Sequence, residues 1–279
     1  MPMDIIWPHL TFGNAQKPPI IFLHGFMGRG EDWRAVCEML AGDFYCLAPD
    51  LPGHSEKTKL PLDAPIIFND LAKGVLTLLD VYALPLAALV GYSMGGRVAL
   101  HTIIKHPARF RALVLESASP GLKEEKERQE RLEIDGMRAK NILQNGLPSF
   151  LEKWYQAEVF ASLQSRPKIL DSIKTARRQN EAAWMAKIII DLSPGQQQPL
   201  WEELPNLALP SLILAGELDE KYSLIATKTA GAVVNAQLQL IPETGHNIHT
   251  EEAGVFVKEV EVFLTRTNEV HPNFCTTQN

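Results

Sequence analysis

The stretch Val90–Gly96, VGYSMGG, decides the fold, because it places Ser93 between an apolar run and a helical run. A serine on such a sharp strand-to-helix turn needs neighbours without a Cβ two positions before and two positions after it, which Gly91 and Gly95 supply. The N-terminus of the following helix directs free N–H groups at developing negative charge. The pattern G-x-S-x-G therefore predicts a nucleophilic serine, with an ordinary glycine-rich turn as the alternative.

Around this stretch, short apolar runs alternate with amphipathic ones. This alternation predicts an α/β fold with a mostly parallel central sheet and helices on both faces. The expected strands cover residues 19–23, 44–48, 86–90, 112–115, 211–215 and 238–241. The expected helices of this sheet cover residues 31–40, 66–79, 94–105 and 251–264.

Between residues 121 and 200 the alternation stops and no strand-like run is found. Charged amphipathic segments follow one another instead, at residues 123–144, 148–163, 167–179 and 181–192. We therefore expect a core made of residues 1–120 and 201–270, a helical cap made of residues 121–200, and a C-terminal tail at residues 271–279.

Composition and charge argue against several classes of protein. Lys and Arg number 27 against 33 Asp and Glu, a net charge of −6, so no global field attracts nucleic acid. The three cysteines, Cys37, Cys46 and Cys275, lack the spacing of a disulfide framework or a zinc site. The sequence shows no dinucleotide-binding or phosphate-binding glycine pattern and no apolar run near the about 18 residues of a membrane span. Its first residues lack a basic region followed by a long apolar run, so we expect no signal peptide. We expect a cytoplasmic protein with no metal, cofactor, membrane or obligate protein partner.

Three further segments complete the chemistry that the serine begins. The run LHGFMG at residues 23–28 follows the first core strand, so the backbone N–H groups of Phe26 and Met94 are expected to form an oxyanion hole. His246 lies between a strand and a helix, as a catalytic base should, and Asp219 follows another strand. The order Ser93, Asp219, His246 is the order typical of α/β-hydrolases.

Each of these assignments has rivals in the sequence. His24, His54 and His249 also lie near strand ends or in loops, and His24 is favoured as a brace for the oxyanion loop. Glu217 is close to Asp219, and Glu116 ends the strand after the nucleophile. Asp219 is favoured because it lies further beyond its strand, where a loop side chain can reach back to an imidazole.

Arg97, four residues after Ser93, narrows the range of possible substrates. It projects about one helical turn from Ser93, where a guanidinium suits a carboxylate and gives nothing to a neutral acyl chain. Residues 123–187 carry 13 Lys and Arg against 10 Asp and Glu, although the overall charge is negative. A cationic cap over an acidic body predicts a polyanionic small substrate, while solvated helix faces explain most of these charges individually.

Several strings together resemble one family. They are GYSMGGRVAL at residues 91–100, SPGL at 119–122 before the arginine-rich EEKERQERL, WYQAEVFASL at 154–163, GELDEKY at 216–222 and GHNIH at 245–249. The chain resembles 2-succinyl-6-hydroxy-2,4-cyclohexadiene-1-carboxylate synthases of menaquinone and phylloquinone biosynthesis, from about residue 18 to residue 264. The resemblance implies a lyase on an α/β-hydrolase fold that eliminates pyruvate from 2-succinyl-5-enolpyruvyl-6-hydroxy-3-cyclohexene-1-carboxylate, a tricarboxylate.

The resemblance also implies residue roles. Arg97, Arg131 and Arg177 would bind substrate carboxylates, with Arg178 as the alternative to Arg177, and Tyr92 and Trp154 would line the pocket. Ser93 would act as the base that removes a ring proton, so no acyl-enzyme is required. The alternatives are a carboxylesterase or C–C hydrolase for another anionic substrate, and an inactive α/β-hydrolase fold that only binds a ligand or partner.

Overall fold

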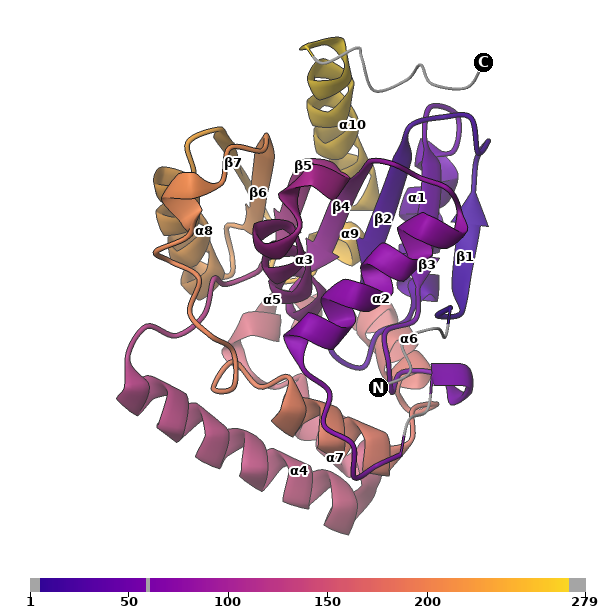
Figure 1. The fold of residues 1–279 in the computed structure, drawn as a ribbon. Helices are drawn as coiled ribbons and strands as arrows, with labels where there is room; N and C mark the ends of the chain where they lie inside the picture. The colour runs from indigo at the N-terminus through magenta and orange to yellow at the C-terminus, as the bar shows by residue number, and fades with distance from the viewer. Residues whose placement is uncertain (1–5, 59–60, 271–279) are drawn as a thin grey trace.

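The computed structural model describes residues 6–58 and 61–270, and the expected tail at 271–279 lies outside them. These residues contain one seven-stranded sheet with the strand order β1-β3-β2-β4-β5-β6-β7 (Figure 1). The strands are β1 (His9–Phe12), β2 (Pro19–Leu23), β3 (Tyr45–Pro49), β4 (Ala87–Tyr92), β5 (Phe110–Glu116), β6 (Ser211–Gly216) and β7 (Ala236–Ile241). Only β1 pairs antiparallel within this sheet, so the mostly parallel sheet that the sequence predicted is present.

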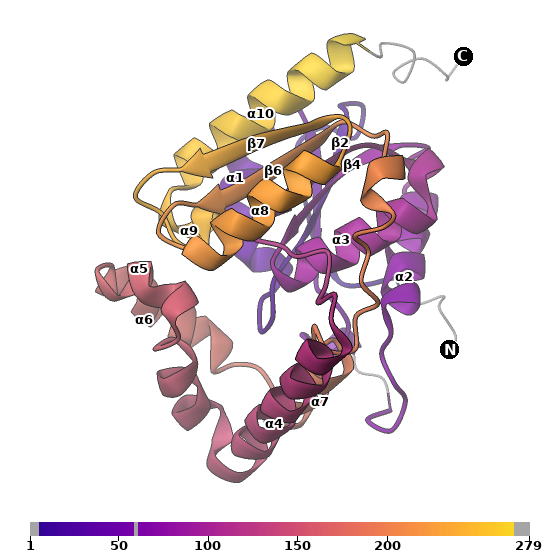
Figure 2. The ribbon, with the colours of Figure 1, turned by 90° about the vertical axis from the view of Figure 1, so that its left-hand side faces the viewer.

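Helices cover both faces of the sheet, which explains why its central strands are continuously apolar. On one face lie α2 (Phe68–Val81), α3 (Met94–Lys105) and α8 (Glu220–Ala232), and on the other lie α1 (Arg34–Leu40) and α10 (Ala253–Val270) (Figure 2). Every residue of β4 is buried, as expected for a strand packed on both sides. Two buried apolar clusters, one on each face, form the core.

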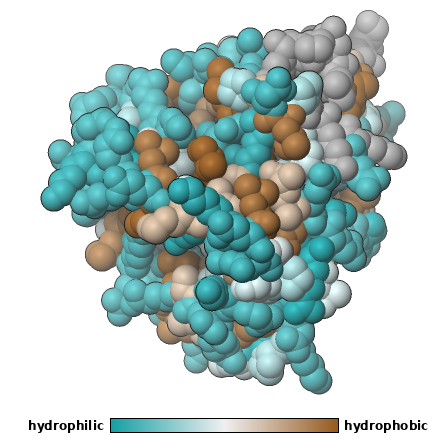
Figure 3. All heavy atoms as spheres, turned by 90° about the horizontal axis from the view of Figure 1, so that it is seen from below, coloured by the Kyte–Doolittle hydropathy of each residue, from teal (hydrophilic) through white to brown (hydrophobic). Residues whose placement is uncertain are grey.

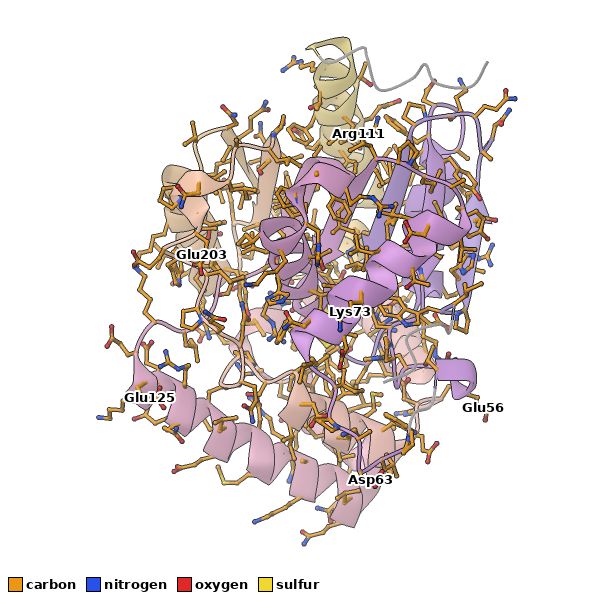
Figure 4. The ribbon with its side chains drawn as sticks, in the orientation of Figure 1. Glu56, Asp63, Lys73, Arg111, Glu125 and Glu203 are labelled. Atoms are coloured by element: carbon orange, nitrogen blue, oxygen red, sulfur yellow. The ribbon has the colours of Figure 1, made fainter. Side chains whose placement is uncertain are left out.

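The segment between β5 and β6 is helical and lies beyond one end of the sheet (Figure 2). It contains α4 (Glu125–Trp154), α5 (Ala161–Gln164), α6 (Pro167–Arg177) and α7 (Ala182–Asp191). In Figure 4, Arg111 on β5 is labelled near the top, and Glu125 at the start of α4 is labelled at the lower left. Figure 3 views the helical end directly and shows brown apolar patches within a mainly hydrophilic surface.

The remaining helices are short. They are the 3-10 turns Gly30–Trp33, Glu56–Thr58, Pro107–Arg109, Glu158–Phe160 and Leu204–Asn206, and α9 (Ile248–Glu251). Within the described residues, no helix combines the length and the apolar character needed to cross a membrane.

Three elements differ from the sequence-based expectation, for identifiable reasons. The strand β1 was not expected, because its four residues are half-buried or exposed at the sheet edge and show no apolar run. The helix α8 was not expected, because only Ala226 and Thr229 of its residues are buried, which leaves no apolar stripe. The helix expected at residues 148–163 is interrupted after Trp154, where α4 ends and a 3-10 turn precedes α5.

The order of the strands places the site. The chain runs from β2 outward to β3, then crosses back to β4 and continues outward in the other direction. Loops after β2 and β4 therefore diverge at the carboxyl ends of two neighbouring strands, which is where open parallel sheets bind their ligands. Ser93 follows β4 directly, and the run containing Phe26 follows β2.

Candidate active site

Ser93 occupies a strained turn between β4 and α3. Its backbone has φ 51° and ψ −107°, outside the regions that most residues adopt. A Cβ on Gly91 would lie 2.5 Å from the Gly95 carbonyl oxygen, and a Cβ on Gly95 would lie 2.2 Å from the Leu23 carbonyl oxygen. Only glycine fits at both positions, so the sequence pattern follows from the tightness of this turn.

A chain of hydrogen bonds joins Ser93, through His246, to a carboxylate. The Ser93 hydroxyl donates to His246 Nε2 at 3.0 Å, and His246 Nδ1 donates to Asp219 Oδ2 at 2.6 Å. His246 and Asp219 are almost fully buried, at 4% and 3% exposure. The buried carboxylate fixes the imidazole tautomer that leaves Nε2 free to accept the serine proton. The three residues predicted from the sequence are therefore adjacent, and hydrogen bonds join them in the order Ser93, His246, Asp219.

The rival residues have other partners. Glu116 and His249 pair with each other, since Glu116 Oε2 accepts the His249 ring N–H at 2.7 Å and Oε1 accepts the His249 backbone N–H at 3.0 Å. Glu217 is exposed, and it is Asp219 that binds His246 Nδ1. His24 Nδ1 donates to the Gly25 carbonyl at 2.8 Å, and its Nε2 accepts the Leu51 N–H at 2.9 Å, so it braces the loop after β2.

The predicted oxyanion donors both lie at the cavity. Phe26 and Met94 are among its lining residues. Met94 is the first residue of α3, where backbone N–H groups lack partners inside the helix. The loop carrying Phe26 passes next to the nucleophile, because a Cβ on Gly25 would come within 3.7 Å of Ser93 Cβ. The two N–H groups thus come from loops that converge on Ser93.

A cavity of about 270 Å³ opens between the sheet end and the helical segment, and Ser93 and His246 lie on its wall. Its apolar wall includes Trp154, Phe160 and Ile188, all from the helical segment. Four cationic side chains also line it: Arg97, Arg131, Arg138 and Lys221. Asp135 and Glu158 are the two carboxylates among the lining residues, so cations outnumber them.

Arg97 is buried in this wall and has neutral partners. Its guanidinium donates to the Leu192 carbonyl at 2.7 Å and to Gln197 Oε1 at 3.3 Å. Among the described residues it forms no ion pair. Burial lowers the pKa of Arg97 to about 10, so it remains charged at neutral pH. A buried cation without a carboxylate is a strong site for an anionic ligand group.

Arg131 and Arg138 share one carboxylate. Arg131 Nε donates to Asp135 Oδ2 and Arg138 Nη1 donates to Asp135 Oδ1, both at 2.8 Å, and the Ser193 hydroxyl also donates to Oδ2 at 2.7 Å. Arg138 also lies over the Trp154 ring, 5.2 Å from its centroid. Asp135 therefore orients two arginines whose remaining donors can face the cavity.

Two predicted pocket residues lie elsewhere. Tyr92 is not a lining residue, because its ring packs behind the base, 5.4 Å from His246 and 4.9 Å from His249 between ring centroids. Arg177 is not a lining residue either, because it is buried in a two-bond ion pair with Asp32, at 2.8 and 2.6 Å. Arg178 lies outside the cavity wall and donates to Glu152 at 3.3 Å.

Arg138 and Lys221 line the cavity but were not singled out from the sequence. Arg138 is seven residues, about two helical turns, after Arg131, so both lie on one face of α4. The seven-residue spacing from Arg131 was the feature of the sequence that could have identified Arg138 as a lining residue. Lys221 follows Asp219 by two residues at the start of α8, and nothing in its sequence context distinguishes it from a solvated lysine.

Burial and the Arg177 charge act in opposite directions on Asp32. Burial alone would raise the pKa of this carboxyl, but the charge and hydrogen bonds of Arg177 hold it below its ordinary value. The same pairing keeps the pKa of Arg177 above its ordinary value despite burial. This pair is fully ionised at neutral pH. In the described part of the chain, no group of three or more His, Cys, Asp or Glu side chains is arranged to hold a metal ion.

Comparison with known proteins identifies the family. Residues 18–253 match the model of the alpha/beta hydrolase fold. A putative 2-succinyl-6-hydroxy-2,4-cyclohexadiene-1-carboxylate synthase of Bacillus subtilis (strain 168) is 34% identical, over 91% of this chain and 92% of that protein. The solved structure of MenH from S. aureus is 33% identical with a TM-score of 0.88, covering 93% of this chain and 98% of that one.

One further relative differs in length. The protein PHYLLO, chloroplastic, of Arabidopsis thaliana is 31% identical over 91% of this chain, but the chain spans only 16% of that protein. The bacterial relative, in contrast, matches over nearly its whole length. The chain belongs to the α/β-hydrolase fold family and, within it, to the family of 2-succinyl-6-hydroxy-2,4-cyclohexadiene-1-carboxylate synthases.

Proposed function

We propose that this protein eliminates pyruvate from 2-succinyl-5-enolpyruvyl-6-hydroxy-3-cyclohexene-1-carboxylate to give 2-succinyl-6-hydroxy-2,4-cyclohexadiene-1-carboxylate. The observation that carries the proposal is the hydrogen-bonded Ser93–His246 pair opening onto a cavity that holds the unpaired cation Arg97. The names of its relatives support the same reaction. The family places that reaction in menaquinone or phylloquinone biosynthesis, and a cytoplasmic location remains a prediction.

The charge of the cavity fits this substrate. The substrate carries three carboxylates on a compact ring, and Arg97, Arg131, Arg138 and Lys221 offer more positive charge than Asp135 and Glu158 neutralise. Bidentate pairing between guanidinium and carboxylate adds direction to this attraction. We assign Arg97 to one carboxylate and the Arg131–Arg138 pair to another, with Trp154 against the ring.

The reaction begins with removal of a proton. Ser93 Oγ takes the proton from the ring carbon that bears the succinyl group, while its own proton passes to His246 Nε2, which Asp219 orients. Negative charge then develops on the neighbouring succinyl carbonyl oxygen. The N–H groups of Phe26 and Met94 stabilise this charge, and a single donor of this kind typically contributes about 10²–10³ in rate.

Elimination follows from the same electron pair. Electrons form a new double bond at the ring carbon, shift the existing ring double bond, and break the carbon–oxygen bond to the enolpyruvyl group. Enolpyruvate leaves and takes a proton, supplied by His246, to become pyruvate. No bond to Ser93 forms, so the same residues that hydrolyse esters in other proteins act here as a base and an anion-stabilising site.

A comparison of two reactions tests the proposal. Pyruvate release from the enolpyruvyl cyclohexene substrate is followed with lactate dehydrogenase, beside cleavage of p-nitrophenyl acetate. We expect rapid pyruvate release with negligible ester cleavage, and a loss of about 10³-fold or more in Ser93→Ala. Ser165→Ala, at an exposed serine of the cap, is the matched control and should behave as the unsubstituted enzyme.

The opposite result has a defined meaning. Rapid ester cleavage without pyruvate would exclude the elimination and assign the protein to hydrolysis of another anionic substrate. Activity of Ser93→Ala equal to that of Ser165→Ala in both assays would remove Ser93 from the chemistry altogether.

A further inference from the structure

The loop after β2 has a strained backbone beside the nucleophile. The Gly28 N–H donates to the Gly25 carbonyl at 3.0 Å, which closes a tight turn with Phe26 and Met27 at its centre. Met27 has φ 62°, in the left-handed region that is unfavourable for a residue with a Cβ. A strained backbone conformation persists only where neighbouring groups stabilise it. The contacts of this loop therefore determine the direction of the Phe26 N–H.

The end of α6 supplies one of these contacts directly. Asn180, three residues beyond Arg177, donates from Nδ2 to the Met27 carbonyl at 2.9 Å. The same nitrogen also donates to the Arg177 carbonyl at 3.1 Å, so this amide nitrogen links the Arg177 backbone to the Met27 backbone. Asn180 is 9% exposed, and its bond therefore joins two buried groups.

The second contact runs through Asp32. Arg177 donates to both carboxylate oxygens of Asp32, and Asp32 Oδ2 in turn accepts the Arg29 N–H at 3.2 Å. Gly28 lies directly on this carboxylate, because a Cβ there would come within 2.6 Å of Asp32 Oδ2. Arg177 thus fixes the carboxylate that underlies the second half of the loop.

We propose that Arg177, at the end of cap helix α6, and Asn180, three residues beyond it, are positioning residues that hold the Phe26 N–H against Ser93, and that Arg177 does not bind a substrate carboxylate. The inference rests on the proposed function only in taking the Phe26 N–H as an oxyanion donor. On this proposal, residues of the cap support the oxyanion hole in addition to forming the cavity wall.

The geometry separates this role from that of a substrate ligand. Both terminal nitrogens of Arg177 already bind Asp32, and Arg177 is 7% exposed without lining the cavity. A substrate carboxylate would have to displace Asp32 and leave that buried carboxylate without its counter-ion. Arg97 offers the same guanidinium on the cavity wall without that cost.

A reagent without carboxylates distinguishes the two roles. A neutral fluorophosphonate reacts with an activated serine, and its phosphoryl oxygen needs the oxyanion hole in the transition state. We expect Arg177→Met to slow the labelling of Ser93 by about 10- to 100-fold and to lower kcat for pyruvate release similarly, with KM within about twofold. Arg178→Met, whose neighbouring guanidinium contacts Glu152 on the surface, is the matched control and should change neither rate.

A ligand role for Arg177 predicts the reverse pattern. If Arg177→Met raised KM about tenfold or more while Ser93 labelling stayed at the rate of Arg178→Met, the proposal would be overturned. The labelling rate does not depend on which substrate the enzyme uses. Failure of the elimination reaction therefore leaves this test intact and is distinguished from failure of the positioning role.

A milder variant guards against misfolding. Arg177→Met leaves Asp32 buried without a partner, so its circular dichroism and thermal unfolding are compared with those of Arg178→Met. Asn180→Ala removes the bonds to the Met27 and Arg177 carbonyls and creates no unpaired charge. We expect Asn180→Ala to slow labelling by about fivefold or more without a change in KM, and labelling at the unsubstituted rate would contradict the proposal. Arg177→Lys keeps one charge contact with Asp32 and should recover part of the labelling rate.

Discussion

At the scale of single residues, Asp219 shows how a helix N-terminus orients a carboxylate toward a histidine. Its Oδ1 accepts the Tyr222 N–H at 3.1 Å as the N-cap of α8, which leaves Oδ2 for the His246 Nδ1–H at 2.6 Å. Capping fixes the rotamer, because the side chain must lie over the first turn of the helix. Glu217 precedes this turn and is exposed, so it has no comparable anchor.

Arg97 is the residue whose removal should separate binding from chemistry. Arg97→Ala deletes the buried guanidinium that we assign to a substrate carboxylate. We expect KM for pyruvate release to rise about 10- to 100-fold, because a charge-assisted hydrogen bond contributes about 1.5–3 kcal/mol, while kcat falls much less. Steady-state kinetics over a range of substrate concentrations measures both values.

Arg109→Ala is the control for the loss of an arginine. Arg109 pairs with Asp80 on the surface at 2.7 Å, in the turn before β5 and away from the cavity wall. This variant should retain the unsubstituted KM. If KM were unchanged in Arg97→Ala as well, the charge of Arg97 would not contribute to substrate binding. The substrate could then be a neutral compound.

The sequence predicted which residues lie together where local motifs decide their positions, and it missed pairings between residues that are far apart in the chain. Ser93 and its glycines follow from the geometry of one turn, and His246 and Asp219 follow strand ends in a fixed order. The family resemblance implied that Arg177 binds a substrate carboxylate, and nothing in its local sequence reveals its pairing with Asp32, which is 145 residues away. Tyr92 adjoins Ser93 in sequence, but alternation along β4 turns its ring behind the base rather than into the cavity.

At the scale of elements, α4 is bent where the sequence predicted a break between two helices. Gly146 has φ 74° and ψ 166° inside the helix, and Pro148 follows it. A proline cannot complete the helical hydrogen bonds of the preceding turn, and a glycine accepts the resulting backbone at little cost. The bend directs the second part of α4, which carries Trp154, back toward the cavity.

A pair of glycine substitutions in this helix tests the bend. Gly146→Ala places a Cβ on a left-handed backbone, so we expect a loss of about 1–2 kcal/mol in the free energy of unfolding. Gly136→Ala, in the regular part of the same helix with no atom within 4 Å of the new Cβ, should instead gain about 0.5–1 kcal/mol. Urea unfolding of both variants measures the difference. Equal stabilisation by both would show that Gly146 is not held in the left-handed conformation.

At the scale of the whole molecule, buried histidines should make stability depend on pH. Burial lowers the pKa of both His24 and His54 below 6.5, and His24 Nε2 already accepts the Leu51 N–H, so a proton there would break that bond. As the pH falls below 6.5, these histidines become protonated in the unfolded chain but stay neutral in the folded protein. The free energy of unfolding is therefore highest above that pH and declines below it. We expect Tm to fall between about pH 7.5 and pH 5 at constant ionic strength.

His54→Gln tests the origin of that decline. The variant keeps a polar side chain but cannot titrate, so Tm should fall less steeply with decreasing pH than in the unsubstituted protein. His54 is 1% exposed, and the comparison is therefore made on the slope of Tm against pH rather than on Tm itself. Parallel slopes for the two proteins would assign the decline to other groups.

Charge is also distributed unevenly over the whole molecule, and this distribution should control how substrate arrives. The net charge of the chain is −6, yet the cavity wall carries Arg97, Arg131, Arg138 and Lys221. A cationic cavity in an acidic body attracts a trianion only at short range, and salt screens this attraction. We expect kcat/KM for pyruvate release to fall about threefold or more between about 0.02 M and 0.5 M salt. Labelling of Ser93 by a neutral fluorophosphonate should stay constant over the same range, and an equal fall in both rates would indicate that salt perturbs the catalytic residues instead of the attraction.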